Sequence, residues 1–487
     1  MTKKWLLIGV AALTMGASKM DILPVGQPMT ASDKATGAKA HPQILQEFGD
    51  AYAGPQSAYV RSVGQKIAVQ SGLSNSQSDF TVTLLNSPVD NAFAIPGGYV
   101  YVTRNLMGLM NNEAELASVL GHEIGHVAAR HSAQRNSRAT KGGLIAVLST
   151  VLGSAIGGSE GAKLGQAIGG NIATRYVMGY SQAQEFQADD LGVSYISKAG
   201  YDPRASSTML ASLAAQTALD ARVTGRGESS LPKWASSHPD PASRVARAAQ
   251  KAAATGSTSQ MRNESQFLAA VDGVMYGDDP KQGVVEGRTF RHPDLKLSFT
   301  APTGFVISNS PSAVTISGSS GNAEFSALKF DGSLTDYVKE VFKSVGGGQS
   351  TPNFGEVSRT DINGIPAAFA SATAQNQSGQ ELKVTVYAYE FATGSRYHIV
   401  AITPVSSASS FDSLFQSVRR LNAQEAAAVR PRRINVVTVK SGDTVQKLAD
   451  RMAFDDYKLD RFLVLNSLAA NATLRPGQKL KTVVYGQ

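Results

Sequence analysis

The sequence of 487 residues contains no cysteine. Disulfide bonds, thiol catalysis, thiolate metal ligands and a lipid anchor on an N-terminal cysteine are therefore excluded for it. It also lacks any run of basic residues with interleaved aromatic side chains. The net charge of +8 is therefore interpreted as diffuse surface basicity or as affinity for an anionic surface, and we expect no nucleic-acid partner.

The N-terminus has the layout of a secretory signal peptide over residues 1–18. Lys3 and Lys4 precede an apolar run from Trp5 to Met15, and small residues follow at 16–18. The apolar run is too short to span a bilayer comfortably. We expect export of the chain; a buried N-terminal strand or helix is the alternative.

Patterns along the chain predict an α+β protein with several domains. Residues 31–254 alternate helix-spaced and strand-spaced apolar positions, and residues 255–285, rich in small and polar side chains, are predicted to be a linker. Residues 286–425 predict an α+β unit with a mainly antiparallel sheet, which resembles the PsbP/Mog-type sandwich in its strand–helix order. No catalytic group of residues is evident in this middle domain.

A small module is predicted at the C-terminus, over residues 434–485. It has a strand–helix–helix–strand (βααβ) order, and Val439–Thr444 and Leu474–Leu480 carry its characteristic residues. It resembles a LysM module, which implies binding to N-acetylglucosamine polymers such as peptidoglycan. The alternative is a degenerate LysM fold that serves as a docking or dimerisation piece.

The string Gly121-His-Glu-Ile-Gly-His126 carries the predicted chemistry. Residues four apart on a helix lie one above the other, so His122 and His126 can bind one cation, while Glu123 can reach a water at that cation. This is the arrangement of a zincin, with Glu123 as the general base. Gly125 costs about 1 kcal/mol inside a helix, which indicates clearance for substrate or for a neighbouring segment.

A third metal ligand must come from elsewhere in the chain. A third ligand in the metzincin pattern is excluded, because Ala129 and Ser132 stand where that pattern needs glycine and histidine. His131 is interpreted as serving the helix end. A predicted second helix offers Glu185 and Asp189 on one face. Glu185 can ligate zinc, and Asp189 can accept the outer N–H of a ligand histidine.

Four ordered motifs resemble the Ste/Oma/HtpX-type zinc metallopeptidases (peptidase family M forty-eight), in the soluble branch that includes periplasmic proteases. They are Asn91–Gly98, the His-Glu-Ile-Gly-His string, Glu185 with Asp189, and Ser237–Arg244. The resemblance implies a gluzincin-type, mainly helical protease domain. It also implies one Zn²⁺ per chain, held by His122, His126 and Glu185.

The same resemblance places His238 and Arg244 beside the metal, among the catalytic residues. His238 could stabilise an oxyanion or occupy the fourth zinc position as a latch. The alternative is structural: the prolines next to His238 suit a helix start, and Arg244 suits an ion pair.

Two further segments are predicted to lie near the active site. Asn91 to Val102 is expected to form an edge strand and turn to which an extended substrate adds, with Asn91, Ala92, Phe93, Tyr99 and Val100 as contact residues. Residues 142–170, rich in glycine and apolar side chains, are interpreted as an amphipathic hairpin that touches a membrane or a membrane protein, or as two helices packed on the catalytic core.

Together these features predict a periplasmic zinc endopeptidase that degrades misfolded or stalled envelope proteins and is held near peptidoglycan. Contact with the membrane or with outer-membrane assembly machinery is a further expectation. Two alternatives stay open: a zinc-dependent peptidoglycan hydrolase, and a latched protease that acts as an envelope chaperone or assembly factor.

Overall fold

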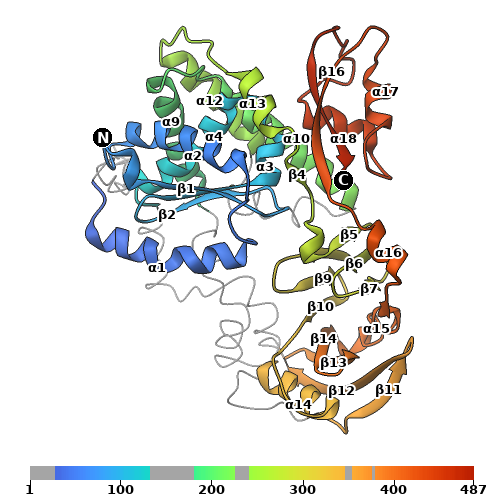
Figure 1. Ribbon diagram of the computed structural model, residues 1–487. Coiled ribbons are helices and arrows are strands. Elements are labelled where there is room, and N and C mark those ends of the chain that lie inside the picture. The colour runs from blue at the N-terminus through green and yellow to red at the C-terminus, as the bar shows by residue number, and fades with distance from the viewer. Residues whose placement is uncertain are drawn as a thin grey trace, which may run out of the picture.

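The computed structural model describes residues 28–131, 180–224, 238, 241–345, 354–375 and 379–486 (Figure 1). The predicted signal peptide at 1–18 and the predicted hairpin at 142–170 lie outside these residues. None of the helices in the described ranges has the length and apolar character needed to cross a membrane.

The N-terminal half is a layered α+β unit around a small sheet. Its strands are β1 (Thr81–Leu85), β2 (Ala92–Ile95) and β3 (Tyr99–Thr103), in the order β1-β3-β2. The helices are α1 (Ala31–Glu47), α2 (Pro55–Ala68), α3 (Arg104–Leu109), α4 (Glu113–Ala128), α9 (Gln182–Lys198), α10 (Ala205–Thr224), α12 (Pro241–Ala254) and α13 (Glu264–Val271).

Helix α1 covers one face of the sheet, and helices α2 and α4 cover the other (Figure 1). Successive side chains of each strand point to opposite faces, so each strand contributes to both cores. Phe93 and Tyr101 point to α1, where they pack against Ile44. Ala94 and Val102 belong to the opposite core, which they share with α2 and α4. The catalytic helix therefore lies directly on this sheet.

The strand order corrects one prediction. β3 is the central strand, because it pairs in parallel with β1 and antiparallel with β2. The backbone of Tyr99 and Val100 is thus paired on both sides and cannot accept a substrate strand. β2 is an edge strand among the described residues, so only Asn91, Ala92 and Phe93 keep the predicted position.

The predicted linker at 255–285 is also wrong. Phe267, Leu268 and Val271 of α13 are buried in the core that α2 and α4 share. β4 (Met275–Tyr276) then pairs with the C-terminal strand β16 (Arg432–Thr438), with Tyr276 opposite Arg432. This segment is therefore part of the folded core.

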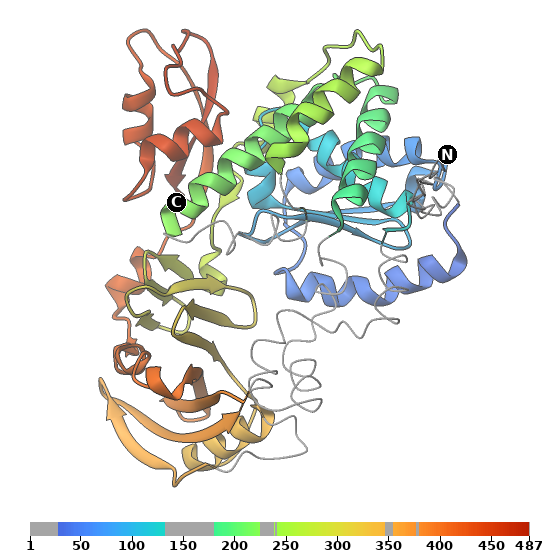
Figure 2. The ribbon, with the colours of Figure 1, turned by 180° about the vertical axis from the view of Figure 1, so that it is seen from behind.

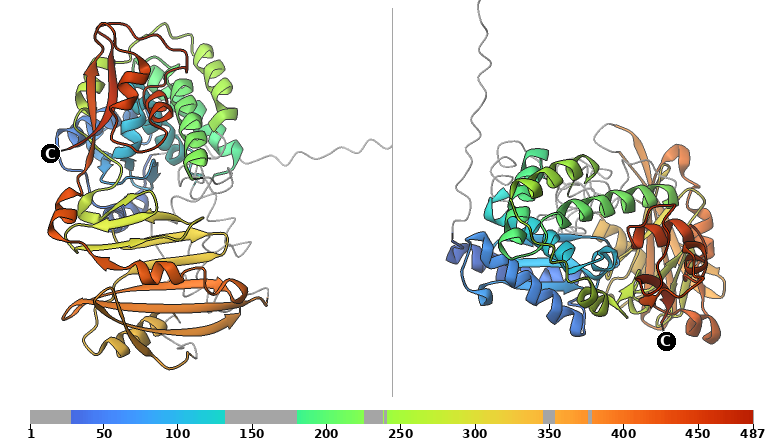
Figure 3. Two further views of the ribbon diagram at one scale, coloured as in Figure 1. Left: turned by 90° about the vertical axis from the view of Figure 1, so that its right-hand side faces the viewer. Right: turned by 90° about the horizontal axis from the view of Figure 1, so that it is seen from above.

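The middle domain consists of two antiparallel sheets with helices (Figure 3). The larger sheet has seven strands in the order β11-β12-β13-β14-β10-β9-β8, and the smaller one has the order β15-β7-β6-β5. Helix α14 (Leu334–Val345) covers one face of the larger sheet. The remaining elements are β5 (Val284–Glu286), β6 (Thr289–His292), β7 (Leu297–Thr300), β8 (Val306–Asn309), β9 (Val314–Gly318), β10 (Gly321–Ser326), β11 (Ser358–Ile362), β12 (Ile365–Gln375), β13 (Glu381–Ala392), β14 (Ser395–Pro404), α15 (Asp412–Ser417), β15 (Arg419–Arg420) and α16 (Ala423–Ala428).

The C-terminal module has the predicted strand–helix–helix–strand order: β16, α17 (Val445–Asp450), α18 (Lys458–Leu465) and β17 (Lys479–Tyr485). β16 lies between β17 and β4 in one sheet. Buried side chains of the module, among them Ile434, Phe462 and Val483, belong to the same hydrophobic cluster as the core of the N-terminal unit. The module is therefore packed against this unit, and Figure 2 shows α10 running from the helices of the unit to the module.

Candidate metal centre

The site is built where α4 crosses α9 at short range. A Cβ atom placed on Gly192 would lie 3.0 Å from the backbone nitrogen of His122, and one on Gly125 would lie 3.0 Å from the carbonyl oxygen of Ala188. The glycines therefore allow the two helix backbones to touch. This explains the helix-interior Gly125: the clearance is for a neighbouring helix.

Each helix starts at a side-chain cap. The Asn112 side chain accepts a hydrogen bond from the Glu115 amide at 3.0 Å and begins α4. Ser181 and Gln184 form a reciprocal capping box at the start of α9. These caps fix the rotation of both helices, and hence the directions in which their polar side chains point.

Four buried side chains converge between these helices: His122, His126, Glu185 and His238. One potential ligand atom from each lies within 4.8 Å of all the others. The Nε2 atoms of His122 and His126 are 3.0 Å apart, and the Glu185 carboxylate lies 3.4 Å from the Nε2 atom of His126. His238 Nδ1 lies 3.1 Å from the Glu185 carboxylate. The structure thus brings together the three predicted ligands and His238.

Glu123 lies beside this group without joining it. Its carboxylate is 3.4 Å from His238 Nε2, and its side chain is almost wholly buried. Burial raises the pKa of Glu123 above its ordinary value. A carboxylate with a raised pKa can both take and return a proton near neutral pH.

A second layer of contacts orients the His122 ring. Asp189 lies 2.9 Å from His122 Nδ1, which leaves Nε2 directed at the converging group. The Arg244 guanidinium in turn donates two hydrogen bonds to Asp189, at 2.8 and 2.6 Å, and forms an ion pair with Glu185 at 2.6 Å. Arg244, predicted among the catalytic residues, thus contacts two carboxylates and sits one layer back from the converging ligand atoms.

The His126 side has a matching second layer that the sequence interpretation missed. His131 Nδ1 lies 2.8 Å from His126 Nδ1, and the other His131 nitrogen lies 3.1 Å from the Gln187 side chain. The helix ends at Ala128, and Arg130 has a left-handed φ of 53°, which turns the chain back. His131 therefore folds over His126, whereas the prediction had assigned it to the helix end.

Tyr180 also contacts His126 and was not predicted. Its ring stacks on the imidazole, with centroids 3.8 Å apart and an angle of 20° between the planes. No pattern in the sequence marks this residue, because it precedes the cap of α9 and has no helix spacing to the histidines.

The electrostatics of the cluster favour bound cations. Burial alone would raise the pKa of Glu185, but His238, His122 and His126 outweigh burial and lower it. Burial also raises the pKa of Asp189, but the hydrogen bonds from Arg244 and His122 outweigh burial and lower this pKa to about 2. Burial lowers the pKa of His126 well below its usual value, so this ring is neutral and able to ligate a metal.

The charge balance of the cluster fits a divalent cation. Glu123, Glu185 and Asp189 are three buried carboxylates, and Arg244 is the one guanidinium that contacts them in the described structure. Metal ligation requires neutral histidines, and with these, two negative charges stay uncompensated, which one divalent cation would balance. Burial lowers the pKa of His122, but the hydrogen bonds to Asp189 and Glu185 outweigh burial and raise this pKa to about 9, so binding of a cation displaces a proton from this ring. Imidazole nitrogens with one carboxylate oxygen form a donor set suited to zinc.

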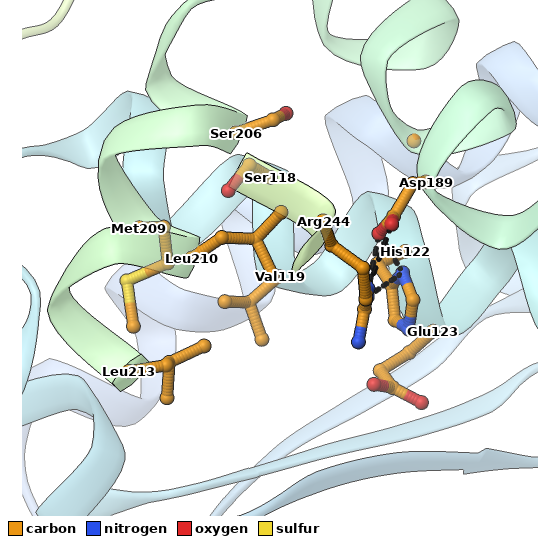
Figure 4. A pocket seen from close by; sticks show the side chains of 11 residues that line it. Ser118, Val119, His122, Glu123, Asp189, Ser206, Met209, Leu210, Leu213 and Arg244 are labelled. Carbon is orange, nitrogen blue, oxygen red and sulfur yellow. Dashed lines mark hydrogen bonds and ion pairs between the residues drawn. The ribbon is translucent and has the colours of Figure 1, made fainter. Parts of the chain in front are cut away.

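Two hollows adjoin the cluster. One is lined by His122, Glu123 and Arg244 at one end and by apolar side chains of α4 and α10 at the other (Figure 4). Its apolar wall consists of Val119, Met209, Leu210 and Leu213. The other hollow reaches His126 from the turn between β2 and β3 and from the start of α1.

The predicted substrate strand lies on the sheet beneath α4. Ala92 and Phe93 are buried in β2, and Asn91 precedes it, with its carbonyl accepting a hydrogen bond from the Thr103 amide at 2.9 Å. In the described structure, the buried Asn91 side-chain amide has no hydrogen-bond partner.

Comparison with known proteins gives two family matches and several relatives. Residues 55–252 match Peptidase family M48, and residues 437–482 match the LysM domain. A Beta-barrel assembly-enhancing protease of Escherichia coli O157:H7 is 30% identical over 270 residues, which cover 50% of this chain and 51% of that protein. The protein of the same name from Yersinia pestis is 29% identical over 262 residues, with coverage of 50% and 51%.

A third relative carries the name of a metalloendopeptidase. The Mitochondrial metalloendopeptidase OMA1 of Schizosaccharomyces pombe is 27% identical over 180 residues, which cover 36% of this chain and 50% of that protein. The chain thus spans about half the length of each of these relatives. Residues 55–252 of this chain are a domain of peptidase family M48, and residues 437–482 are a LysM domain.

Proposed function

We propose that this protein is a zinc endopeptidase of the periplasm, which hydrolyses peptide bonds in misfolded or stalled envelope proteins. The observation that carries the proposal is the convergence of His122, His126 and Glu185 around one point, with Glu123 beside it. One zinc ion per chain, held by these three ligands, would leave a fourth position for chemistry.

The chain's own residues divide the work of hydrolysis. When bound, zinc supplies Lewis acidity that polarises a carbonyl and makes a water more acidic. Glu123 takes the proton from the attacking water and delivers it to the leaving amine. Asp189 keeps the proton of His122 on Nδ1, so that Nε2 stays a ligand, and Arg244 holds Asp189 and Glu185 in place.

Substrate binding is proposed to use the two surfaces that adjoin the cluster. An extended segment of an unfolded protein would pair with β2, an edge strand among the described residues, at Asn91, Ala92 and Phe93 through main-chain hydrogen bonds. One apolar side chain of that segment would enter the hollow walled by Val119 and Leu213. Main-chain pairing with one apolar anchor selects unfolded polypeptide over a particular sequence.

The LysM domain and the relatives support the proposed location of the substrate. A LysM domain at residues 437–482 supports a peptidoglycan contact. Two relatives carry the name Beta-barrel assembly-enhancing protease, which supports substrates and partners at the outer-membrane assembly machinery. Export by the N-terminal signal would bring the enzyme to the same compartment.

The Glu123→Gln variant tests this function against wild type. It keeps the shape of the site but removes the base, so we expect it to bind zinc and to lose cleavage of unfolded casein. Removal of zinc from the wild type should abolish cleavage, and its return should restore it. Unchanged cleavage by Glu123→Gln would overturn the assignment. Release of soluble muropeptides without casein cleavage would instead indicate a peptidoglycan hydrolase.

A second candidate function is favoured by the position of His238. Its Nδ1 atom lies 3.3 Å from His122 Nε2 and 3.1 Å from Glu185, within the ligand group. There it would occupy the fourth zinc position and hold the protease closed, so that the protein acts as a chaperone or assembly factor until His238 leaves.

The His238→Ala variant separates a latch from a catalytic role. A latch predicts faster casein cleavage in the variant, because the fourth position is opened. An oxyanion-stabilising role predicts slower cleavage, by about 100-fold for one lost donor. Zinc content measured in parallel shows whether a lower rate comes from lost metal.

A further inference from the structure

A lysine of the LysM domain is buried against the segment that leads into the catalytic helix. The Lys481 side chain, on β17, is fully buried. Its Nζ atom donates hydrogen bonds to the carbonyl oxygens of Gly108, Leu109 and Met110, at 2.7, 3.2 and 2.5 Å. These carbonyls end α3 and precede Asn112, the cap residue of α4.

Three carbonyl acceptors around one ammonium form a complete cap. The last carbonyls of a helix have no partner within the helix and carry its negative end. A lysine ammonium has three donors, and here each one meets a carbonyl. The Glu115 carboxylate binds the Asn111 amide at 2.8 Å within the same connection, which places an opposite charge near the ammonium. Loss of Lys481 would therefore leave buried carbonyls unsatisfied.

The other end of α3 is held by the same sheet. Arg104, the fully buried first residue of α3, donates to the carbonyls of Met275 and Gly277 at 3.1 and 2.6 Å. Met275 lies in β4, which pairs with β16, and β16 pairs with β17. The sheet β17-β16-β4 and the residue that follows β4 thus form hydrogen bonds with both ends of α3.

The LysM domain also touches α10, which walls the apolar hollow at the active site. Ser467 lies 2.8 Å from Ser212 of α10 and accepts a hydrogen bond from Asn111 at 2.9 Å. Further along α10, Arg222 forms an ion pair with Asp460 at 2.9 Å. The contacts therefore reach both the start of the catalytic helix and the helix behind the hollow.

We propose that Lys481 is a positioning residue for catalysis, and that the LysM domain is a working part of the peptidase as well as a glycan-binding module. By holding the α3–α4 connection, Lys481 sets the position of α4, and thereby that of Glu123 relative to the ligands supplied by α9. This proposal rests on the proposed function, because it assumes that Glu123 acts as the base. A displacement of about 1 Å in such a group lowers the rate by about 100-fold.

The test compares Lys481→Met with Lys479→Met in the full-length, zinc-loaded protein. Both lysines lie on β17, but Lys479 is exposed. Lys481→Met should lower kcat for a casein-derived fluorogenic peptide at least tenfold with a smaller change in KM, because α4 is misplaced while β2 and the α10 wall of the hollow persist. Amide hydrogen exchange over residues 108–113 should become faster in the same variant. Lys479→Met should match wild type in both measurements.

Two results would overturn the proposal. One is wild-type kcat and wild-type exchange in Lys481→Met. The other is a fall in kcat that only follows the loss of folded, zinc-loaded protein, since that shows a structural role alone.

If Lys481→Met does not fold, Ser467→Ala replaces it. This variant removes the contacts to Asn111 and Ser212 without unpairing a charge. A smaller fall in kcat with faster exchange over residues 108–113 is expected, and wild-type values in both would refute the proposal. Zinc-independent cleavage by the wild type would instead refute the proposed function, while the exchange measurement would still test the contact made by Lys481.

Discussion

Asp189 offers the sharpest test of the site, because it links the proposed ligands to the rest of the fold. Its carboxylate lies 2.9 Å from Nδ1 of His122 and accepts hydrogen bonds from Arg244 at 2.8 and 2.6 Å. The substitution Asp189→Asn keeps the size of the side chain and removes its charge. The expected primary effect is therefore on the affinity for zinc.

The magnitude follows from what the carboxylate does for His122. The charged Asp189 carboxylate accepts the hydrogen bond from Nδ1–H of His122. It thereby fixes the tautomer in which Nε2 is unprotonated and makes Nε2 a stronger metal ligand. Loss of such a partner lowers metal affinity by about 10- to 100-fold, which equals about 1.4–2.7 kcal/mol. Arg244 keeps its ion pair with Glu185 at 2.6 Å, so the loss should stay below that of a fully unpaired buried charge.

Asp190→Asn is the matched control. Asp190 is the next residue on α9, and its carboxylate pairs with Arg247 at 2.6 Å on the partly exposed side of the helix. Such surface pairs contribute about 0–1 kcal/mol, and Asp190 contacts no proposed ligand. Zinc affinity is measured for wild type and both variants by competition with a chelating dye, with kcat/KM for the casein peptide in parallel.

The result that would refute the reasoning is equal zinc affinity in Asp189→Asn and Asp190→Asn. It would mean that Asp189 has no influence on the metal through His122. Lower affinity in Asp189→Asn alone, accompanied by lower kcat/KM, is the expected outcome.

Three further predictions concern other parts of the chain. Burial lowers the pKa of His398 to about 4, below its unfolded value of about 6.5, so the unfolded state binds more protons between these values. The middle domain should thus lose about 3 kcal/mol of stability as the pH falls from 6.5 to 4, and urea unfolding of His398→Gln should show a flatter pH dependence. Gly192→Val should destabilise the protein by about 1–3 kcal/mol and reduce its zinc content, because the new Cβ would lie 3.0 Å from the His122 backbone nitrogen. Thermal unfolding of this variant, with Ser194→Ala as the control, measures the loss of stability. Replacement of residues 278–430 by a short turn should leave zinc-dependent casein cleavage intact, because Tyr276 and Arg432 already lie opposite each other; an insoluble product would contradict this.

The part of the site that lies on one helix could be predicted from the sequence. The spacing of His122 and His126 fixes their shared face without knowledge of the remaining chain. The structure also places Glu185 and Asp189, four residues apart on α9, against these histidines. Local helix geometry and four ordered motifs were sufficient for these residues.

The parts that depend on chain reversal or strand order could not be predicted in this way. His131 was assigned to the helix end because a continuing helix carries it away from His126, but the left-handed Arg130 reverses the chain. Tyr99 and Val100 were placed on an edge strand, since the alternating pattern that marks a strand does not reveal its neighbours. The order β1-β3-β2 depends on contacts between segments that are separate in sequence.

The predicted linker failed for a reason that also changes the domain arrangement. Small and polar residues at 255–285 suggested a flexible connection, but three apolar side chains of α13, within this stretch, are buried in the core of the N-terminal unit. The chain then leaves the core at β4 and returns at β16, which is its direct neighbour in the sheet.

The middle domain is therefore inserted between two strands of one sheet, so that the peptidase and LysM domains are consecutive in space although far apart in sequence. Residues 371 to 373 positions apart come together where Lys481 meets the carbonyls before α4. The two sides of this contact lie on opposite sides of the inserted middle domain. The C-terminal strand β17 therefore supports the segment that leads into the catalytic helix, although the insertion separates the two in sequence.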